Sequence, residues 1–509
     1  MTDERQVARM LGDLMQAGHT ATLEQLPGLV AAHAADAGLW QVRLFVVDLQ
    51  EVILRELTGR GANAGEGGLE FPVEGSLPGR AYQRVDLLRE TGGTNHGTVN
   101  RTSAGTRNGT GAGDGIGKSG KASVGGGHWN GSGAAAGTCT DTRIGTGTDT
   151  RTGKNDEDDK GGDDRNGSNT AADTSTSTST STSTSNGNGN GNGPTGTRNS
   201  GSYRWWTAVT DGVERLGVLR ADTADDSEQT RSALRALASM TALLLLSKRS
   251  FSDSYARLTR TAPMNVAAEL QWNLMPPPAY AGHDVTVGAA LEPAYAVGGD
   301  AFDYAVAGRV LHLSVLDAMG HDTTAGLTAN VAVAAARNAR RQGLGLAQIS
   351  QAVEEVLIGQ FGNTRYVTGI FADLDLDTGV LGWVNRGHHP PILVRGGRWT
   401  RPLACPPAGP MGAGLGLPVH VCREQLEPGD SVLLHTDGIT EARDPDGNEF
   451  GLDRFTDFVV RHHSGQQTLH ETLRRLMRAV LHHHHGSLDD DATVLLTEWR
   501  GSRHEDLIP

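Results

Sequence analysis

Four aspartates placed at the ends of expected strands are the residues to which chemistry can most readily be assigned. Asp317 closes one apolar run, Asp437 follows another, and the acidic run 489–491 precedes a third. Asp300 follows two glycines. Carboxylates at strand ends, beside glycines that let the backbone approach closely, suit hard divalent cations such as Mg²⁺ or Mn²⁺. Segments this far apart in sequence can converge on a pair of ions.

Each aspartate also has a simpler explanation when it is taken alone. Asp437 and Gly438 form a pair that is typical of a turn, because Asp bonds its own backbone and Gly tolerates positive φ. Asp300 after its glycines fits a solvated loop, and the acidic run 489–491 fits a charged turn. A metal site is predicted only by the order and context of all these segments together.

That order resembles the PPM-type, metal-dependent serine/threonine phosphatases of the bacterial SpoIIE/RsbU branch, from about residue 267 to 500. The motifs that carry the resemblance are VGGDAFD at 297–303, LDAMGH at 316–321, YVT at 366–368, NRGHHPP at 385–391, HTDGITEA at 435–442 and DDAT at 490–493. The resemblance implies an α+β fold in which residues 277–500 form an α/β/β/α sandwich, with two stacked antiparallel sheets flanked by helices.

The resemblance also implies a ligand set for two Mn²⁺ or Mg²⁺ ions. Its members would be Asp300, Asp317, the carbonyl of Ala318, Asp437 and Asp490. Asp317 would bridge both ions and, with Asp437, form the catalytic centre. If the acidic run is aligned one residue out of place, Asp491 or Asp489 would replace Asp490.

The sequence departs from the family pattern near this site. Ala318 stands where many members of the family have Val or Gly. Asp322 stands where the family has Gly, and Arg386 stands where it has Ala. Ala318 contributes only backbone, so we expect little effect there. Asp322 brings a further negative charge near the metals, which could tighten cation binding or repel a phosphate. Arg386 could compensate by receiving the substrate phosphate.

The function implied is hydrolysis of a phosphoserine or phosphothreonine ester by water that two metal ions activate. In this branch the usual substrates are phosphorylated anti-sigma-factor antagonists, which control sigma-factor partner switching. One alternative is a catalytically impaired, phosphatase-like regulatory protein that binds a partner without turnover. A further alternative is an ion-binding scaffold without phosphate chemistry.

The N-terminal part, residues 1–89 joined to 203–250, resembles a GAF domain and implies a small-molecule sensor or a dimerisation module. Residues 90–202 are rich in Gly, Thr, Ser and Asn and are expected to be a disordered insertion. Trp205 and Trp206 could line a pocket, although strand aromatics are more often core. A helical linker is expected over 232–276, with an apolar stripe that either pairs in a homodimer or packs on its own domain.

The chain of 509 residues has a formal net charge of −14, which argues against nucleic acid as the main partner. Its three cysteines, Cys139, Cys405 and Cys422, have no paired spacing, so we expect neither a zinc motif nor a disulfide framework. The polar N-terminus lacks a signal peptide, and no apolar run is long enough to span a membrane. The histidine tract 482–485 is interpreted as a solvated loop. Together these observations predict a cytoplasmic protein.

Overall fold

The computed structural model of this chain describes residues 4–90, 202–296, 298–320, 322–463, 468–486, 488 and 490–501. The insertion expected at 90–202 lies outside these residues, apart from its two ends. Within the described ranges, no helix is both long enough and apolar enough to cross a membrane.

The N-terminal domain is built on one antiparallel sheet with the strand order β3-β2-β1-β6-β5-β4. Its strands are β1 (Leu39–Val47), β2 (Ile53–Leu57), β3 (Glu70–Pro72), β4 (Leu87–Arg89), β5 (Tyr203–Asp211) and β6 (Glu214–Thr223). Its helices are α1 (Glu4–Gly18), α2 (Leu26–Asp36), α3 (Leu77–Arg84) and α4 (Glu228–Arg249). The turn between β5 and β6 contains Gly212 at a φ of +57°, as the Asp-Gly pair predicts.

The two faces of this sheet carry separate apolar cores, which decides the role of the two tryptophans. Trp205 packs in the core beneath α1, α2 and α4, and Trp206 packs with Phe45 and Tyr82 on the opposite face. Successive residues of a strand point to opposite faces, so adjacent indoles serve different cores. Both are 4% exposed. They are core residues, and the GAF-like assignment of the domain stays a prediction.

The linker is broken into three helices, α4, α5 (Asp253–Thr259) and α6 (Val266–Leu274). The stripe of α4, including Leu234, Leu237 and Leu245, is buried in the same core as the sheet. The stripe therefore packs on its own domain, which was one of the two alternatives. A homodimer stays a prediction, and it would have to use other residues of the linker, such as the exposed Leu243 and Phe251.

The C-terminal domain contains two antiparallel sheets, ordered β15-β12-β11-β10-β9 and β14-β13-β16-β17-β8-β7. The strands are β7 (Ala279–Ala281), β8 (Val285–Glu292), β9 (Asp300–Ala307), β10 (Val310–Ala318), β11 (Val367–Asp375), β12 (Val380–Arg386), β13 (Ile392–Arg395), β14 (Trp399–Pro402), β15 (Cys422–Gln425), β16 (Ser431–His435) and β17 (Ala492–Trp499). The helices are α7 (Thr323–Arg341), α8 (Leu346–Phe361), α9 (Asp437–Thr440), α10 (Leu452–His463) and α11 (Leu469–His483).

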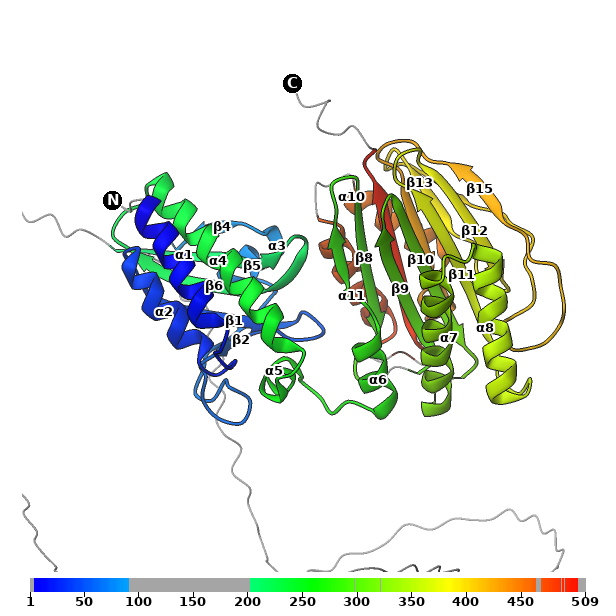
Figure 1. Cartoon of the computed structure of the whole chain (residues 1–509), viewed down its shortest axis with the longest axis horizontal. Coiled ribbons are helices and arrows are strands. Elements are labelled where there is room, and N and C mark those ends of the chain that lie inside the picture. The colour runs from blue at the N-terminus through cyan, green and yellow to red at the C-terminus, as the bar shows by residue number, and fades with distance from the viewer. Residues whose placement is uncertain are drawn as a thin grey trace, which may run out of the picture. The chain divides into compact units, whose positions relative to one another are not determined.

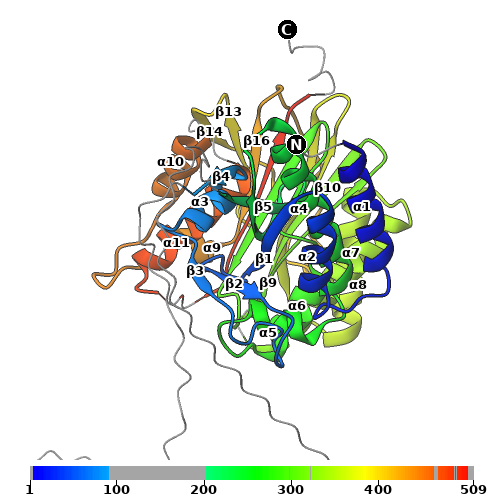
Figure 2. The same cartoon turned by 90° about the vertical axis from the view of Figure 1, so that its left-hand side faces the viewer.

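The layers of this domain are those of the expected α/β/β/α sandwich. Phe302 and Leu313 from one sheet share a core with Leu434 and Leu495 from the other, so the sheets stack face to face. Helices α7 and α8 cover the outer face of the first sheet, and α10 and α11 cover the outer face of the second. Figures 1 and 2 show the two helix pairs on opposite flanks of the strands. The expected fold of this domain is confirmed.

The expectation that the cysteines stay unpaired is wrong. Cys405 and Cys422 form a disulfide with a sequence separation of 17. The sequence spacing does not predict this pair, because it depends on tertiary structure. β15 begins at Cys422, and the pairing of β15 with β12 places Cys422 where it can bond to Cys405. The cytoplasmic location stays a prediction, and the cysteines no longer support it.

Loss of this disulfide is expected to lower the free energy of unfolding by roughly 2–4 kcal/mol, because a crosslink across a loop of this length restricts the unfolded chain. In urea denaturation, the free energy of unfolding of Cys405→Ser without reductant should match that of wild type with reductant. Cys139→Ser, which leaves the pair intact, is the control and should match oxidised wild type. Three free thiols in the oxidised, denatured wild type would contradict the assignment.

Candidate metal centre

Strand alternation directs Asp300 and Asp317 into the space between the sheets. In β9, Asp300 lies on the same side as Phe302, and in β10, Asp317 lies on the same side as Val315; both apolar residues belong to the inter-sheet core. Asp300 and Asp317 are directly opposite each other in the antiparallel register. The two carboxylates therefore meet at one end of the sandwich, as the sequence predicts.

The second sheet contributes its residues at the same end. Thr436, which follows β16, donates a hydrogen bond from its hydroxyl to Asp300 Oδ2 at 2.6 Å. The Thr493 amide of β17 donates to the Thr436 hydroxyl oxygen at 2.9 Å. These bonds connect the ends of the two sheets. They also place Asp437, the next residue after Thr436, beside the first pair of carboxylates.

The two described aspartates just before β17, Asp490 and Asp491, have different environments. Asp491 is 4% exposed, and its Oδ2 accepts hydrogen bonds from the amides of Gly298 and Gly299, each at 2.7 Å. Asp491 thus fixes the glycine loop that precedes Asp300. Asp490 is exposed, its Oδ1 accepts a hydrogen bond from the Asp491 amide at 2.9 Å, and its charge helps to raise the pKa of Asp317. This division favours Asp490 over Asp491, and Asp489 lies outside the described residues.

Gly299 allows the backbone just before β9 to approach the end of β10 closely. A Cβ at this position would lie 2.2 Å from the carbonyl oxygen of Ala318 and 2.7 Å from that of Gly320. The Ala318 amide donates to the Gly299 carbonyl at 3.0 Å. Only glycine fits here, and the contact holds the Ala318 carbonyl at the site end of β10, where it can serve as the expected backbone ligand.

The electrostatics of the cluster suit cations. Burial, together with Asp437, Asp490 and Asp491, raises the pKa of Asp317 to about 7. Burial, together with Asp317 and Asp491, raises the pKa of Asp300 well above its usual range. Carboxylates gathered in this way disfavour their own ionised forms unless a positive charge joins them. Hard oxygen donors fit Mg²⁺ or Mn²⁺, so the residues present are suited to the ions that the resemblance implies.

These shifts predict that the metal-free protein loses stability as pH rises through about 7. The folded-state pKa of Asp317 lies above its unfolded value, so the folded state binds a proton more tightly. The resulting stability is fully present below the unfolded pKa, near 4, and is lost as pH rises through 7. With EDTA present, the fall in melting temperature between pH 5.5 and 7.5 should be larger for wild type than for Asp317→Asn. An identical fall in both proteins would contradict the assignment.

The structure corrects the role expected for Arg386. Its side chain is among the largest that are fully buried; it pairs with Glu354 and donates from Nε to the Gly409 carbonyl at 2.8 Å. A guanidinium enclosed in this way is not available to receive a substrate phosphate. Asp322 is the N-cap of α7 and accepts a hydrogen bond from the Ala325 amide at 2.8 Å. A helix-capping role therefore accounts for this departure from the family pattern.

The histidines of the loop after β12 have separate roles. His388 bonds through Nδ1 to the Thr368 hydroxyl at 2.8 Å and through Nε2 to the His435 carbonyl at 3.0 Å. Burial is the main cause that lowers its pKa to about 3, so it is neutral. Its role is structural. His389 is exposed beside Asp437 and Glu441, and neither His389 nor Glu441 belongs to the ligand set predicted from the sequence.

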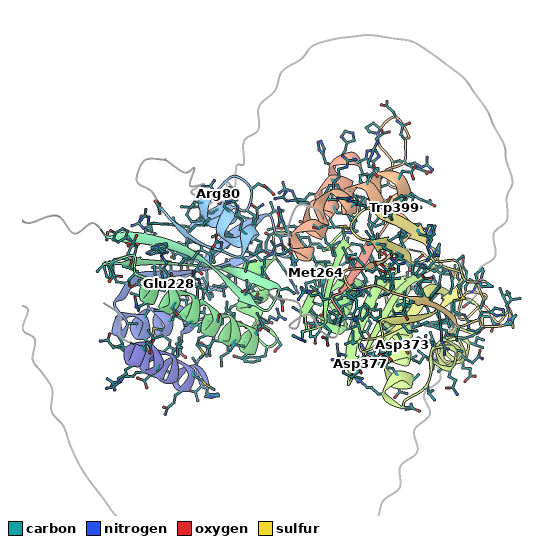
Figure 3. The ribbon with its side chains drawn as sticks, turned by 90° about the horizontal axis from the view of Figure 1, so that it is seen from above. Arg80, Glu228, Met264, Asp373, Asp377 and Trp399 are labelled. Carbon is teal, nitrogen blue, oxygen red and sulfur yellow. A yellow bond between two sulfur atoms is a disulfide. The ribbon has the colours of Figure 1, made fainter. Side chains whose placement is uncertain are left out.

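The carboxylate cluster is separate from a surface depression of about 690 Å³ in the same domain. That depression is lined by Val310, at the opposite end of β10 from Asp317, and by Asp373, which Figure 3 labels. Its lining includes Gly345 and Val421 and none of the predicted metal ligands. The carboxylate cluster therefore does not lie in this depression.

Comparison with known proteins gives the context of this centre. Residues 307–500 match the family described as Stage II sporulation protein E (SpoIIE). Among solved structures, the RsbU and RsbW domains of a Mycobacterium tuberculosis protein are 27% identical with a TM-score of 0.38, covering 43% of this chain and 62% of that one. The PP2C phosphatase domain of Bacillus subtilis SpoIIE, with a fragment of its regulatory domain, is 22% identical with a TM-score of 0.37, covering 43% and 64%.

The SiaA PP2C domain of Pseudomonas aeruginosa is 21% identical with a TM-score of 0.38, covering 42% of this chain and 85% of that one. This chain therefore spans less than two thirds of the length of the first two matched structures. The family match lies entirely within the C-terminal domain and includes Asp317, Asp437 and Asp490. Residues 307–500 of this chain are accordingly similar to the SpoIIE family.

Proposed function

We propose that the C-terminal domain hydrolyses phosphoserine or phosphothreonine esters of a protein substrate. The observation that carries the proposal is the convergence of Asp300 and Asp317 from one sheet with Asp437 and Asp490 from the segments flanking the other. These four carboxylates and the Ala318 carbonyl would hold two Mn²⁺ or Mg²⁺ ions. When bound, the ions would polarise the phosphoryl oxygens and lower the pKa of an attacking water.

The residues of the chain have distinct tasks in this proposal. Asp317 and Asp437 would be the central ligands, because Asp317 lies in β10 of one sheet, Asp437 follows β16 of the other, and the charge of Asp437 raises the pKa of Asp317. Thr436 orients Asp300 through its hydroxyl, and Asp491 holds the glycine loop through backbone amides. Gln271 of α6 supports the same loop, donating from Nε2 to the Asp300 carbonyl at 2.6 Å. Positioning of this kind keeps crowded carboxylates in place before any ion arrives.

The proposed substrate is a phosphorylated anti-sigma-factor antagonist, and the proposed setting is cytoplasmic sigma-factor regulation. Support comes from the M. tuberculosis structure, which contains an RsbU domain together with an RsbW domain. The N-terminal part, 1–89 with 203–250, is proposed as a GAF-like sensor that the linker 232–276 joins to the phosphatase domain. A sensor ligand and a homodimer belong to the same proposal.

A catalytically impaired binding protein is the second candidate. The observation that favours it is the burial of Arg386, which removes the basic side chain expected to receive the phosphate. Hydrolysis of an aryl phosphate by the full chain, with Mn²⁺ and with EDTA, separates the candidates. Turnover that requires Mn²⁺ supports the phosphatase; metal binding without turnover of an aryl phosphate or a phosphopeptide supports the binding protein.

A further inference from the structure

We infer that the Cys405–Cys422 disulfide is a redox-sensitive element that controls how firmly the carboxylate cluster is held. The intact disulfide fixes a loop against the end of the sandwich that carries Asp317. Reduction to two thiols would loosen that loop and weaken metal binding. The inference rests on the ligand set of the proposed function. It agrees with the proposed cytoplasmic setting, where disulfides are rare and are usually transient or redox-sensing.

The disulfide joins the two sheets at one edge of the sandwich. Cys405 follows β14, the outermost strand of the second sheet, and Cys422 begins β15, the outermost strand of the first. Both cysteines pack against the core between the sheets. A strand at the edge of a sheet is paired on one side only, and β15 has only four residues. The covalent bond therefore reinforces an edge that short strands close.

The loop that the disulfide closes extends to the metal end of the sandwich. Its residue Met411 exchanges two backbone hydrogen bonds with Val367, each at 2.8 Å. The Met411 side chain is fully buried in the same core as Ala318. Val367 and Thr368 begin β11 and lie directly opposite Ala318 and Asp317 in the register with β10. The loop therefore supports the strand segment that faces two of the predicted ligands.

The same loop also holds the end of β12. The Ala408 amide donates to the Asn385 carbonyl at 2.9 Å. The Asn385 side chain accepts from the His388 amide and donates to the His388 carbonyl, each at 2.8 Å. His388 in turn bonds to the Thr368 hydroxyl and to the carbonyl of His435, which ends β16. A displacement of the loop would thus reach the site ends of both sheets.

The second half of the loop is the part that depends most on the crosslink. Residues 414–418 are exposed, and the side chains of Leu415 and Leu417 are each more than half exposed. Segments with few buried apolar contacts open locally at a low cost in free energy. Without the crosslink this half would be free to open, and the segment around Met411 would be less restrained.

A reductant can reach one end of the bond. Cys422 is half-buried, whereas Cys405 is 8% exposed. A thiolate of a dithiol reductant would attack the Cys422 sulfur and release the Cys405 thiolate. The second thiol of the reductant would then displace the Cys422 thiolate, and both thiolates would take up protons. Two electrons pass from the dithiol, which becomes a disulfide. Oxidised glutathione, itself a disulfide, would reverse the reaction.

The test equilibrates the full chain with mixtures of oxidised and reduced glutathione, counts its free thiols, removes the glutathione and measures Mn²⁺ affinity. Reduced wild type should bind Mn²⁺ roughly tenfold more weakly than oxidised wild type, as expected when the support of metal ligands is lost. Reoxidation should restore the affinity. Cys405→Ser and Cys422→Ser should bind weakly after every mixture. Cys139→Ser, which leaves the pair intact, is the matched control and should follow wild type.

Hydrogen exchange of the metal-free protein separates a local effect from a general loss of stability. With EDTA present, reduction should speed exchange at the amides of Val367 and Met411, which bond across the loop contact. The Leu495 amide lies in the middle of β17, between β16 and β8, and should keep its protection. A crosslink that only stabilises the whole domain would change all three amides together, and that result would contradict the inference.

A disulfide that persists in excess reduced glutathione would overturn the inference, as would equal Mn²⁺ affinities in the two redox states. Hydrolysis of an aryl phosphate by oxidised wild type keeps the two proposals apart. Mn²⁺ binding that depends on the redox state, without hydrolysis, retains the redox element and loses the phosphatase. Hydrolysis with a Mn²⁺ affinity that does not depend on the redox state retains the phosphatase and loses the redox element.

Discussion

Asp317→Asn is expected to lower Mn²⁺-dependent hydrolysis of an aryl phosphate by roughly a thousandfold, because under the proposed function this carboxylate would hold the metal ions, and its loss would remove several kcal/mol of transition-state stabilisation. Asparagine keeps the shape of the side chain and removes its charge. Asp317 faces Asp300 in the strand register and is repelled by Asp437, Asp490 and Asp491. Removing one charge relieves that repulsion, so the metal-free variant should be at least as stable as wild type. Loss of activity without loss of stability identifies a functional carboxylate.

Asp377→Asn is the matched control for this experiment. Asp377 lies in the turn between β11 and β12, its side chain is 58% exposed, and it pairs with Arg309 on the surface. Exposed ion pairs contribute little, so activity and stability should stay close to wild type. Figure 3 labels Asp377 in the C-terminal domain. Equal hydrolysis by Asp317→Asn and the control would remove Asp317 from the centre.

The convergence of the proposed metal ligands was predictable because their signal is local and repeated. Asp317 and Asp437 follow apolar runs, the acidic run 489–491 precedes one, and Asp300 follows two glycines. Strand alternation then decides which side of the sheet a strand residue faces. Asp300 and Asp317 follow that rule directly. The alanine-rich stretch 325–357 predicts one helical region, whereas a break at Gly343, with a φ of +77°, separates α7 from α8. The helical structure of this region was predictable, but the boundary between α7 and α8 was not.

The remaining features depend on contacts between distant segments, which sequence spacing does not encode. From its place in the motif near His388, Arg386 was predicted to bind phosphate. In the structure it pairs with Glu354 of α8, which is 32 residues away in the sequence. Asp490 and Asp491 are adjacent and chemically identical, and the hydrogen bonds that Asp491 accepts from the amides of Gly298 and Gly299 distinguish them. The disulfide depends on the pairing of β15 with β12 in the same way. In each case a tertiary partner decides the role.

Gly438→Ala is expected to destabilise the C-terminal domain by roughly 2–3 kcal/mol, because an added methyl group would be forced into backbone that cannot move aside. A Cβ on Gly438 would lie 1.9 Å from the carbonyl oxygen of Asp491 and 2.7 Å from its carbonyl carbon. The first turn of α9 would have to shift away from the start of β17. The shift would separate Asp437 from Asp490, so Mn²⁺ affinity and hydrolysis should fall together with the melting temperature.

Gly359→Ala shows whether the effect belongs to this contact or to glycine replacement in general. Gly359 is exposed within α8, and an added Cβ would meet nothing within 4 Å. Alanine favours a helix over glycine by about 0.5–1 kcal/mol, so this variant should melt slightly higher than wild type and keep full Mn²⁺ affinity. Opposite signs for the two variants, measured by thermal unfolding with EDTA, would trace the loss in Gly438→Ala to the Asp491 carbonyl. A Gly438→Ala protein as stable as wild type would show that α9 and β17 can separate without cost, and the centre could then not be rigid in the way proposed.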